Sequence, residues 1–348
     1  MKTSTFFVWL GAGLLLFAGC LGEYNPPEIK RTDVIVLINE GSATEAGSVR
    51  LYIENQATLN EPLSDLTGNV RAVSMFEQCL WVTTNNPDAV HIVDMEYGRR
   101  SELPATELQT PRYTNYYGSK LLVSNWGDSV TAAGEHPESF VAVYSLSDYS
   151  RPPTILPCGS DAEAMMVNAT TGRLFVATKQ GVAVFDLTKS TMPRDALIVS
   201  TQFHGNAKQF VADSTGTVWV SYTDGGIMGF DPTTFAVTAE YPVPIDTATG
   251  AIAIDGDWIR VLSYSPSPAV IYATDLTTGV TEERVRNSAY HFTSIGVCPA
   301  SGNIYSSDTK SDDKSTLLIF DKTGRKQAEY ADVGIRTKGY IYFYAESY

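Results

Sequence analysis

One pattern occurs seven times along the chain. Each copy is a pair of short apolar segments rich in β-branched and aromatic residues, and residues 174–178 and 182–187 form the most regular pair. Equivalent positions of the first segment follow one another at intervals of 41 to 53 residues. These positions are Val36, Trp81, Leu122, Phe175, Trp219, Arg260 and Tyr305. Because an isolated hairpin cannot bury its apolar face, the copies are expected to pack against one another.

Each period also has room for two further strands. One precedes the hairpin, as at 112–116 and 164–168, and another follows it, as at 154–157 and 237–242. An aspartate recurs after the second hairpin strand, at Asp94, Asp186, Asp231, Asp275 and Asp321. No amphipathic helical pattern accompanies these strands. Four short antiparallel strands per period predict an all-β fold, a seven-bladed β-propeller.

The two ends of the repeat region complement each other. The chain begins its first hairpin near Val34 with no strand before it, and it ends with an unpaired strand at 338–344. We expect this C-terminal strand to close the first blade from the inside, which removes two open sheet edges. Residues 33–348 are therefore predicted to form one propeller domain.

The N-terminal segment is typical of an export signal. Lys2 precedes the apolar run 6–17, which is short for a membrane span, and the run ends in LFAGC with Cys20. This ending resembles a bacterial lipoprotein signal, which implies a signal peptide at 1–19 and lipidation of Cys20. A polar stretch at 20–32 is expected to be a lipidated tether. Leu21 favours the outer membrane, with the cell surface as the expected side.

The net charge of the chain and the spacing of its cysteines argue against some classes of function. The formal net charge of −14 argues against nucleic-acid binding, since an acidic surface repels phosphates. Cys79, Cys158 and Cys298 lack metal-ligand spacing. Two of them could form a disulfide in an exported protein, but the sequence does not select a pair, and buried free thiols are the favoured interpretation.

Several segments resemble a known family. They are residues 38–41 (INEG), 110–113 (TPRY), 120–127 (KLLVSNWG), 298–305 (CPASGNIY) and 320–324 (FDKTG). Residues 33–348 are similar to the YVTN/YncE-like propellers, and to outer-membrane lipoproteins that capture vitamin B12 and pass it to TonB-dependent transporters. The resemblance implies a cobalamin-like ligand and such a transporter as partner. Residues 158–163 (CGSDAE) depart from the usual blade turn of that family.

A ligand would be expected on the face where loops before inner strands meet loops inside the central hairpins. The candidate contacts there are Arg112, Tyr113, Asn125, Trp126, His204, Tyr222, Tyr264 and His291. Aromatic rings with polar tips suit a flat amphipathic ligand such as a corrinoid. Alternative roles remain open: the tyrosines could close the ring mouth, and Arg112 could pair with a carboxylate of a neighbouring blade.

An enzymatic role has weaker support in the sequence. His204 and His291 occupy equivalent loops two blades apart and could converge, but no nucleophile or acid–base motif accompanies them. The loop 308–313 (DTKSDD) lacks the spacing of a calcium site. We therefore expect no catalytic residues, metal or cofactor. The leading hypothesis is a ligand-binding propeller, with a protein-binding scaffold or a metal-dependent hydrolase or lyase as alternatives.

Overall fold

A computed structural model gives the structure of the protein. It describes residues 30–60, 63, 66–76, 78–95, 99–103, 107–149, 151–244, 248–256, 258–263, 268–309 and 314–347. The predicted signal peptide at 1–19, Cys20 and Tyr264 lie outside these residues. Within the part that is described, no helix is long and apolar enough to cross a bilayer.

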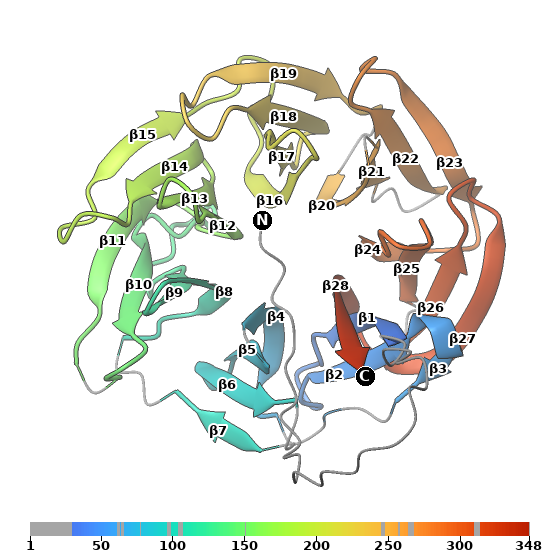
Figure 1. Ribbon diagram of the computed structural model, residues 1–348, viewed down its shortest axis with the longest axis horizontal. Helices are drawn as coiled ribbons and strands as arrows, with labels where there is room; N and C mark the ends of the chain where they lie inside the picture. Colours follow the sequence, from blue (N-terminus) through green and yellow to red (C-terminus); the bar gives the residue numbers. More distant parts are fainter. Residues whose placement is uncertain are drawn as a thin grey trace, which may run out of the picture.

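Seven four-stranded antiparallel sheets surround a central axis (Figure 1). The predicted all-β, seven-bladed propeller is thus confirmed. Strands are given from the axis outward. The first blade contains β28 (Thr337–Ser347), β1 (Lys30–Asn39), β2 (Ser48–Ile53) and β3 (Thr58–Leu59), and the second contains β4 (Asn69–Phe76), β5 (Cys79–Asn85), β6 (Ala89–Asp94) and β7 (Arg100–Glu102). The third blade contains β8 (Pro111–Tyr117), β9 (Lys120–Asn125), β10 (Ser139–Ser145) and β11 (Thr154–Gly159), and the fourth contains β12 (Met165–Asn168), β13 (Arg173–Thr178), β14 (Gly181–Asp186) and β15 (Arg194–Ile198).

The remaining blades follow the same order. The fifth blade contains β16 (Ala207–Ala212), β17 (Val218–Tyr222), β18 (Gly226–Phe230) and β19 (Val237–Pro242). The sixth contains β20 (Ala248–Asp255), β21 (Trp258–Ser263), β22 (Ala269–Asp275) and β23 (Thr281–Asn287). The seventh contains β24 (Phe292–Val297), β25 (Ile304–Thr309), β26 (Lys314–Phe320) and β27 (Lys326–Ile335). A 3₁₀ turn, η1 (Glu54–Gln56), separates β2 from β3. The seven repeat positions found in the sequence all lie in the second strand of their blade.

The C-terminal strand closes the ring as expected. β28 is the innermost strand of the first blade and pairs with β1 from Lys30↔Ser347 to Asn39↔Thr337. The first strand begins at Lys30, slightly before the expected domain start at residue 33.

The core lies between the blades. In most blades the second and third strands are buried along most of their length because both of their faces are covered. Along β9, Leu122 packs toward the fourth blade, whereas Leu121 and Val123 pack toward the second. The apolar clusters of the described residues each join two adjacent blades, and together they run around the whole ring.

Cys79, Cys158 and Cys298 are free thiols in this structure. Cys158 and Cys298 are buried, and Cys79 is half-buried. Burial raises the pKa of Cys158 to about 12, which keeps its thiol protonated and unreactive.

Candidate functional site

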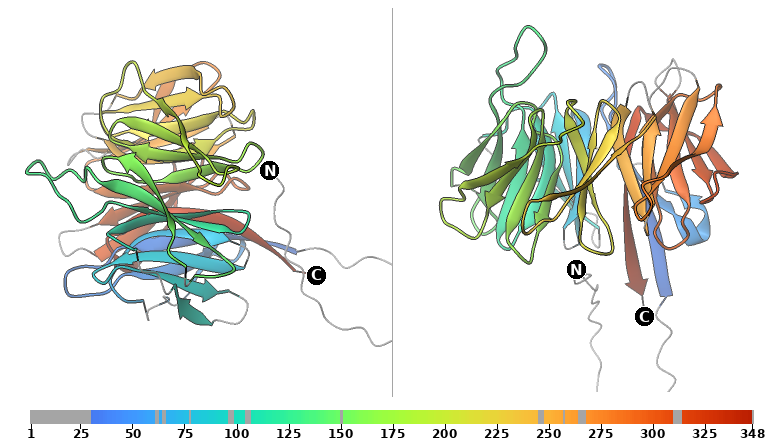
Figure 2. Two further views of the ribbon diagram at one scale, coloured as in Figure 1. Left: turned by 90° about the vertical axis from the view of Figure 1, so that its left-hand side faces the viewer. Right: turned by 90° about the horizontal axis from the view of Figure 1, so that it is seen from above.

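The ring has two chemically different faces. Loops inside the central hairpins bond to the loops before the innermost strands, as in Gly127 N–H to Gln109 O (3.1 Å) and Thr309 N–H to His291 O (3.1 Å). These loops therefore share one face, which we call the upper face. The start of β1 and the end of β28 project from the opposite, lower face (Figure 2).

A distortion recurs at the upper end of the innermost strands. The ladder register shifts at this level in β4, β8, β16, β20, β24 and β28. Such a bulge interrupts the regular alternation of side chains and can aim one of them in a new direction. The equivalent residue at this level in each blade is Lys338, Arg71, Arg112, Glu163, Lys208, Gly250 and Thr293.

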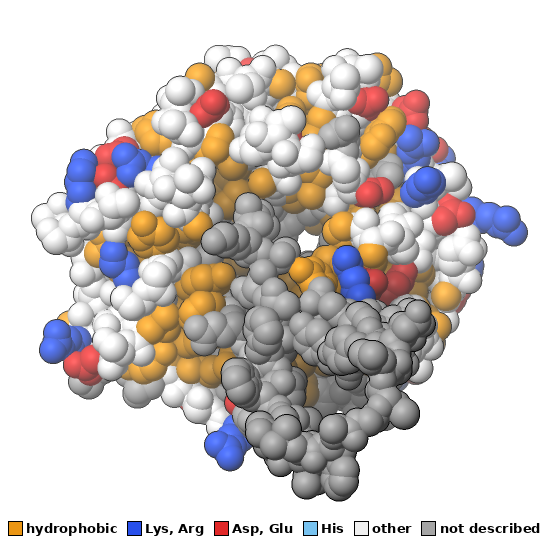
Figure 3. All heavy atoms as spheres, in the orientation of Figure 1, with side chains coloured by type: hydrophobic (Ala, Val, Ile, Leu, Met, Phe, Trp, Pro, Cys, Tyr) orange, Lys and Arg blue, Asp and Glu red, His pale blue; other side chains and the backbone are white. Residues whose placement is uncertain are grey.

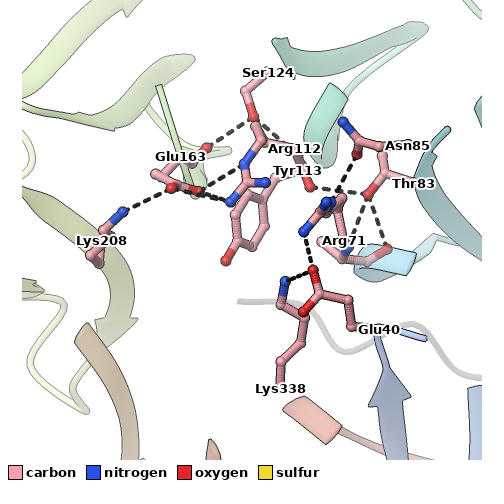
Figure 4. A network of polar contacts seen from close by, with 11 residues as sticks. Glu40, Arg71, Thr83, Asn85, Arg112, Tyr113, Ser124, Glu163, Lys208 and Lys338 are labelled. Carbon is pink, nitrogen blue, oxygen red and sulfur yellow. Dashed lines mark hydrogen bonds and ion pairs between the residues drawn. The ribbon is translucent and has the colours of Figure 1, made fainter. Parts of the chain in front are cut away.

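Five of these residues are charged, and together with Glu40 they form a network at the mouth of the central channel (Figure 4). We call Glu40, Arg71, Arg112, Glu163, Lys208 and Lys338 the mouth cluster. Its members come from the first five blades.

The mouth cluster is organised around its two carboxylates. Glu163 accepts bonds from Arg112 (3.0 to 3.2 Å) and from Lys208 Nζ (2.8 Å). Glu40 pairs with Arg71 and with Lys338 Nζ (3.1 Å). The Glu163 side chain is only 4% exposed. Each carboxylate is therefore shared by two cations, which is the arrangement that makes a buried carboxylate tolerable.

Hydroxyl groups hold the mouth cluster in register between blades. In three blades, a Ser or Thr of the second strand donates a bond to the carbonyl of the residue at this level in the next blade. The pairs are Thr83 with Arg112 (3.0 Å), Ser124 with Glu163 (2.9 Å) and Ser221 with Gly250 (2.5 Å). The same hydroxyls accept an N–H of their own innermost strand. The bulges thus leave these buried backbone groups satisfied.

Burial and charge within the mouth cluster shift the pKa values of its members. Burial alone would raise the pKa of Glu163, but Arg112 and Lys208 outweigh it and lower that pKa. Burial lowers the pKa of Lys338 to about 8; Glu40 opposes this effect, whereas Arg112 and Arg71 add to it. Burial likewise raises the pKa of the Tyr113 hydroxyl. The cluster therefore holds Glu163 ionised, while Lys338 titrates near neutral pH.

Trp126 supports this cluster from the longest hairpin loop. The Arg112 guanidinium lies 3.8 Å from the centre of the Trp126 ring, and His136 stacks on Trp126 at 4.2 Å. Trp126 Nε1 and His136 Nδ1 are both buried without a hydrogen-bond partner among the described residues. Trp126 is thus a positioning residue for Arg112, and its ring faces are already occupied in part.

A hollow channel lies below the cluster. A cavity of about 120 Å³ is bordered by Arg71, Lys338, Tyr113 and Gln209, together with small or apolar side chains. A larger cavity of about 510 Å³ continues along the axis, bordered mostly by apolar residues and by Tyr113, Tyr340 and Tyr342. Viewed along the axis, the surface shows an opening near the centre of the ring (Figure 3). The innermost strands therefore enclose a space with a charged upper end and an apolar body.

Two of the residues expected to contact a ligand are buried instead. Tyr222 is 2% exposed and packs on Phe203 in the core between the fourth and fifth blades. Asn125 is fully buried, where its amide bonds Val123 O and accepts Gln109 N–H. Tyr222 thus packs between two blades, whereas the Asn125 amide is used by backbone groups of its own blade. In this structure both side chains lie in the interior of the protein rather than on its surface.

Two predicted histidines are exposed on the upper face. His204 and His291 occupy equivalent positions, and a hairpin aspartate accepts each backbone N–H: Asp224 at 2.6 Å and Asp308 at 2.7 Å. Among the described residues, no group of three or more His, Cys, Asp or Glu is placed to hold a metal ion. Residues 310–313 of the charged loop lie outside the described residues.

Most of the mouth cluster was not among the residues predicted from the sequence. Arg112 was expected to bind a ligand or to pair across blades, and it pairs across blades. Glu163 and Lys338 were considered only as parts of the segments 158–163 and 338–344, and Arg71 and Lys208 were not predicted site residues. The signal was present in the repeat: each is a charged residue at the same level, near the start of an innermost strand.

Comparison with known proteins supports the fold. No protein-family model and no curated protein matches the chain. A candidate 6-phosphogluconolactonase from Bacteroides fragilis has a TM-score of 0.66 at 11% identity, covering 89% of this chain and 98% of that one. Apo AztD from Citrobacter koseri has a TM-score of 0.59 at 11% identity, with 92% and 100% covered. The computationally designed protein Ika8 has a TM-score of 0.58 at 11% identity, with 87% and 86% covered. At such identities the likeness establishes a shared fold alone.

Proposed function

We propose that this protein is a lipid-anchored propeller that captures a small molecule at its upper face. In this proposal, Cys20 anchors the chain in the outer membrane, and the captured molecule passes to a TonB-dependent transporter. A corrinoid is the first ligand to test, on the strength of the sequence resemblance. The chain acts by binding rather than by catalysis.

One observation carries the proposal. Charged side chains of five blades converge on the mouth of a channel that is hollow below them. Convergent polar groups above an apolar cavity are the usual arrangement of a small-molecule site.

The direction of the chain supports the same role. The first described residue, Lys30, begins β1, whose start projects from the lower face (Figure 2). The mouth cluster lies at the upper end of the inner strands. A tether that precedes Lys30 would therefore leave the ring from the face opposite the site. An anchored protein would then present its mouth away from the membrane, where a ligand arrives.

The chemistry of Glu163 favours binding over proton transfer. A general base works best when its pKa lies near the ambient pH. Glu163 is instead held ionised by Arg112 and Lys208, which lower its pKa. It is therefore suited to fixing two cations in place.

Titration of the purified protein with cyanocobalamin, followed by absorbance, tests the proposal. We expect saturable binding at micromolar concentration. His204→Ala combined with His291→Ala should weaken it, because both side chains are exposed on the upper face. Lys322→Ala is the matched control, since this residue follows β26 on the lower face and should leave binding unchanged. Absence of binding at micromolar concentration would rule out the corrinoid version.

A further inference from the structure

Two cations border the upper cavity and share a single carboxylate. Arg71 and Lys338 both line the cavity of about 120 Å³, and both pair with Glu40. Their side chains are 20% and 28% exposed, so they are largely withdrawn from solvent. Arg112, Glu163 and Lys208 form the second half of the mouth cluster beside them.

The mouth cluster carries an excess of positive charge. Its four cations face two carboxylates, which leaves two positive charges uncompensated inside the cluster. Asp88 is a further carboxylate whose field reaches Arg71, but it lies on an exposed loop and bonds Thr110 N–H at 2.7 Å. This excess stands out in a chain whose formal net charge is −14. Local charge of this kind attracts an anion even when the whole molecule is acidic.

Hydrogen-bond donors remain available in the cluster. The Arg71 guanidinium uses Nε for Asn85 Oδ1 (3.2 Å) and Nη1 for Glu40. Its Nη2 has no hydrogen-bond partner within the described part of the chain. Lys338 Nζ uses one of its three donors on Glu40. Arg71 and Lys338 can therefore each donate to an oxyanion in the cavity without releasing Glu40.

The space below this pair is mostly apolar, with Ser74, Thr114, Asn115 and Gln209 among its polar lining residues. The two cavities share Val73, Tyr113, Gln209, Ile252, Ile295, Tyr340 and Ile341 as lining residues, so they adjoin along the axis. The larger one, of about 510 Å³, then continues past residues such as Phe210, Ile254 and Val297. A molecule with a charged head and an apolar body would match both environments.

We infer that the channel binds an amphipathic oxyanion. Its carboxylate or phosphate head lies between Arg71 and Lys338, and its apolar part extends into the larger cavity. This inference rests on the proposed function, since it names the class of molecule that the mouth captures. Charge-assisted bonds to the head provide selectivity, and burial of the apolar part adds affinity.

The affinity of this site for an anion should depend on pH. The groups that act on Lys338 are Glu40, Arg71 and Arg112, and burial holds its pKa at about 8. Only the protonated amine attracts the anion, so affinity should fall as pH rises through 8, by up to about tenfold between pH 7 and pH 9. A bound anion stabilises the ammonium, so binding near pH 8.5 should take up protons. Calorimetry in buffers of different ionisation enthalpy measures this uptake.

Isothermal titration of the folded protein with n-octyl phosphate and with octanoate provides the test, and 1-octanol is the uncharged control ligand. We expect at least one of the two anions to bind and 1-octanol to bind far more weakly. Lys338→Gln should lower the affinity by about tenfold or more and abolish proton uptake. This variant leaves Glu40 paired with Arg71, so it should fold. Lys326→Gln is the matched control, because Lys326 is exposed and pairs with Glu329 at 2.8 Å on the outermost strand.

The outcomes separate this inference from the proposed function. Failure of both anions to bind at millimolar concentration, or equal losses in the two lysine variants, would overturn the oxyanion site. Anion binding that depends on Lys338, together with no binding of cyanocobalamin, would support the site and reject the corrinoid.

Discussion

Glu163 lies at the centre of a buried charge network. Its carboxylate is 4% exposed and accepts bonds from Arg112 and Lys208, which come from the blades on either side. A carboxylate in this position joins three blades through one side chain. Because two cations converge on it, the network depends on its negative charge.

Replacing Glu163 by Gln should therefore destabilise the fold. The amide keeps the shape but leaves Arg112 and Lys208 without a counter-charge, and loss of one partner from a buried pair costs about 3 kcal/mol. Glu283→Gln is the control, since Glu283 forms an exposed pair with Arg286 and should change stability by less than about 1 kcal/mol. Urea denaturation of both variants measures the difference. Equal midpoints would show that the network contributes little to stability.

At the scale of the strand, the recurring aspartates form the turns between third and fourth strands. Asp186, Asp231 and Asp321 each accept the backbone N–H of the residue two positions later, at 2.7 to 2.9 Å. These bonds fix the turn that reverses the chain at the outer edge of a blade. The repeat seen in the sequence therefore has a specific structural cause.

These turns should make the protein sensitive to acid. A side-chain bond from Thr188 lowers the pKa of Asp186 to about 2, and turn bonds also lower the pKa values of Asp231 and Asp321. A depressed folded-state pKa gives stability that is present above the unfolded value near 4, and it is lost as pH falls toward 2. Melting temperature measured from pH 5 to pH 2 should therefore fall.

The triple variant Asp186→Asn, Asp231→Asn, Asp321→Asn tests whether these aspartates cause the acid sensitivity. Asn keeps an oxygen that accepts the turn N–H but does not titrate, so the melting temperature should depend less on pH in this range. Asp128→Asn changes one exposed carboxylate outside these turns and is the control. A slope that stays the same in the triple variant would assign the acid response to other groups.

At the scale of the whole molecule, the first blade holds the ring closed. β28 supplies its innermost strand and pairs with β1 over the full length of that strand. The two strands come from opposite ends of the chain, so this pairing ties the two termini together. β28 also provides Lys338 to the mouth cluster, which makes closure and the binding site interdependent.

Deletion of residues 339–348 should abolish cooperative unfolding. It removes most of β28, exposes the edge of β1 and opens the apolar contact between the first and seventh blades. Circular dichroism and calorimetry should show no sharp transition. Deletion of residues 1–29 is the control and should leave the transition intact, since it precedes every described strand. A cooperative transition in the C-terminal deletion would show that the ring closes without this strand.

Much of the fold was predictable because the repeat is local. Apolar pairs such as 174–178 and 182–187 mark the second and third strands directly, and their number gives the number of blades. The unpaired segment at the C-terminus predicted the closure of the first blade. Each of these inferences depends on short stretches of chain and on the need to cover apolar faces.

The site was predicted only in part, because the direction of a side chain is set by the ladder. Tyr222 lies at the upper end of its strand, as the sequence suggested, but its ring turns into the core. Arg112 reaches Glu163, which is 51 residues further along the chain. Trp126 supports Arg112 in place of an open ligand face. None of these partners follows from local pattern.

The sequence by itself thus determined the fold class, the number of blades, the position of the strands and the way the ring closes. Only the tertiary structure decided which charged residues meet at the axis. The physical reason is the bulge at the upper end of the innermost strands. It shifts the alternation of side chains and brings Lys338, Arg71, Arg112 and Lys208 to one level of the channel. Glu163, which lies just before β12, joins them there, although Arg71 and Lys338 are separated by most of the chain.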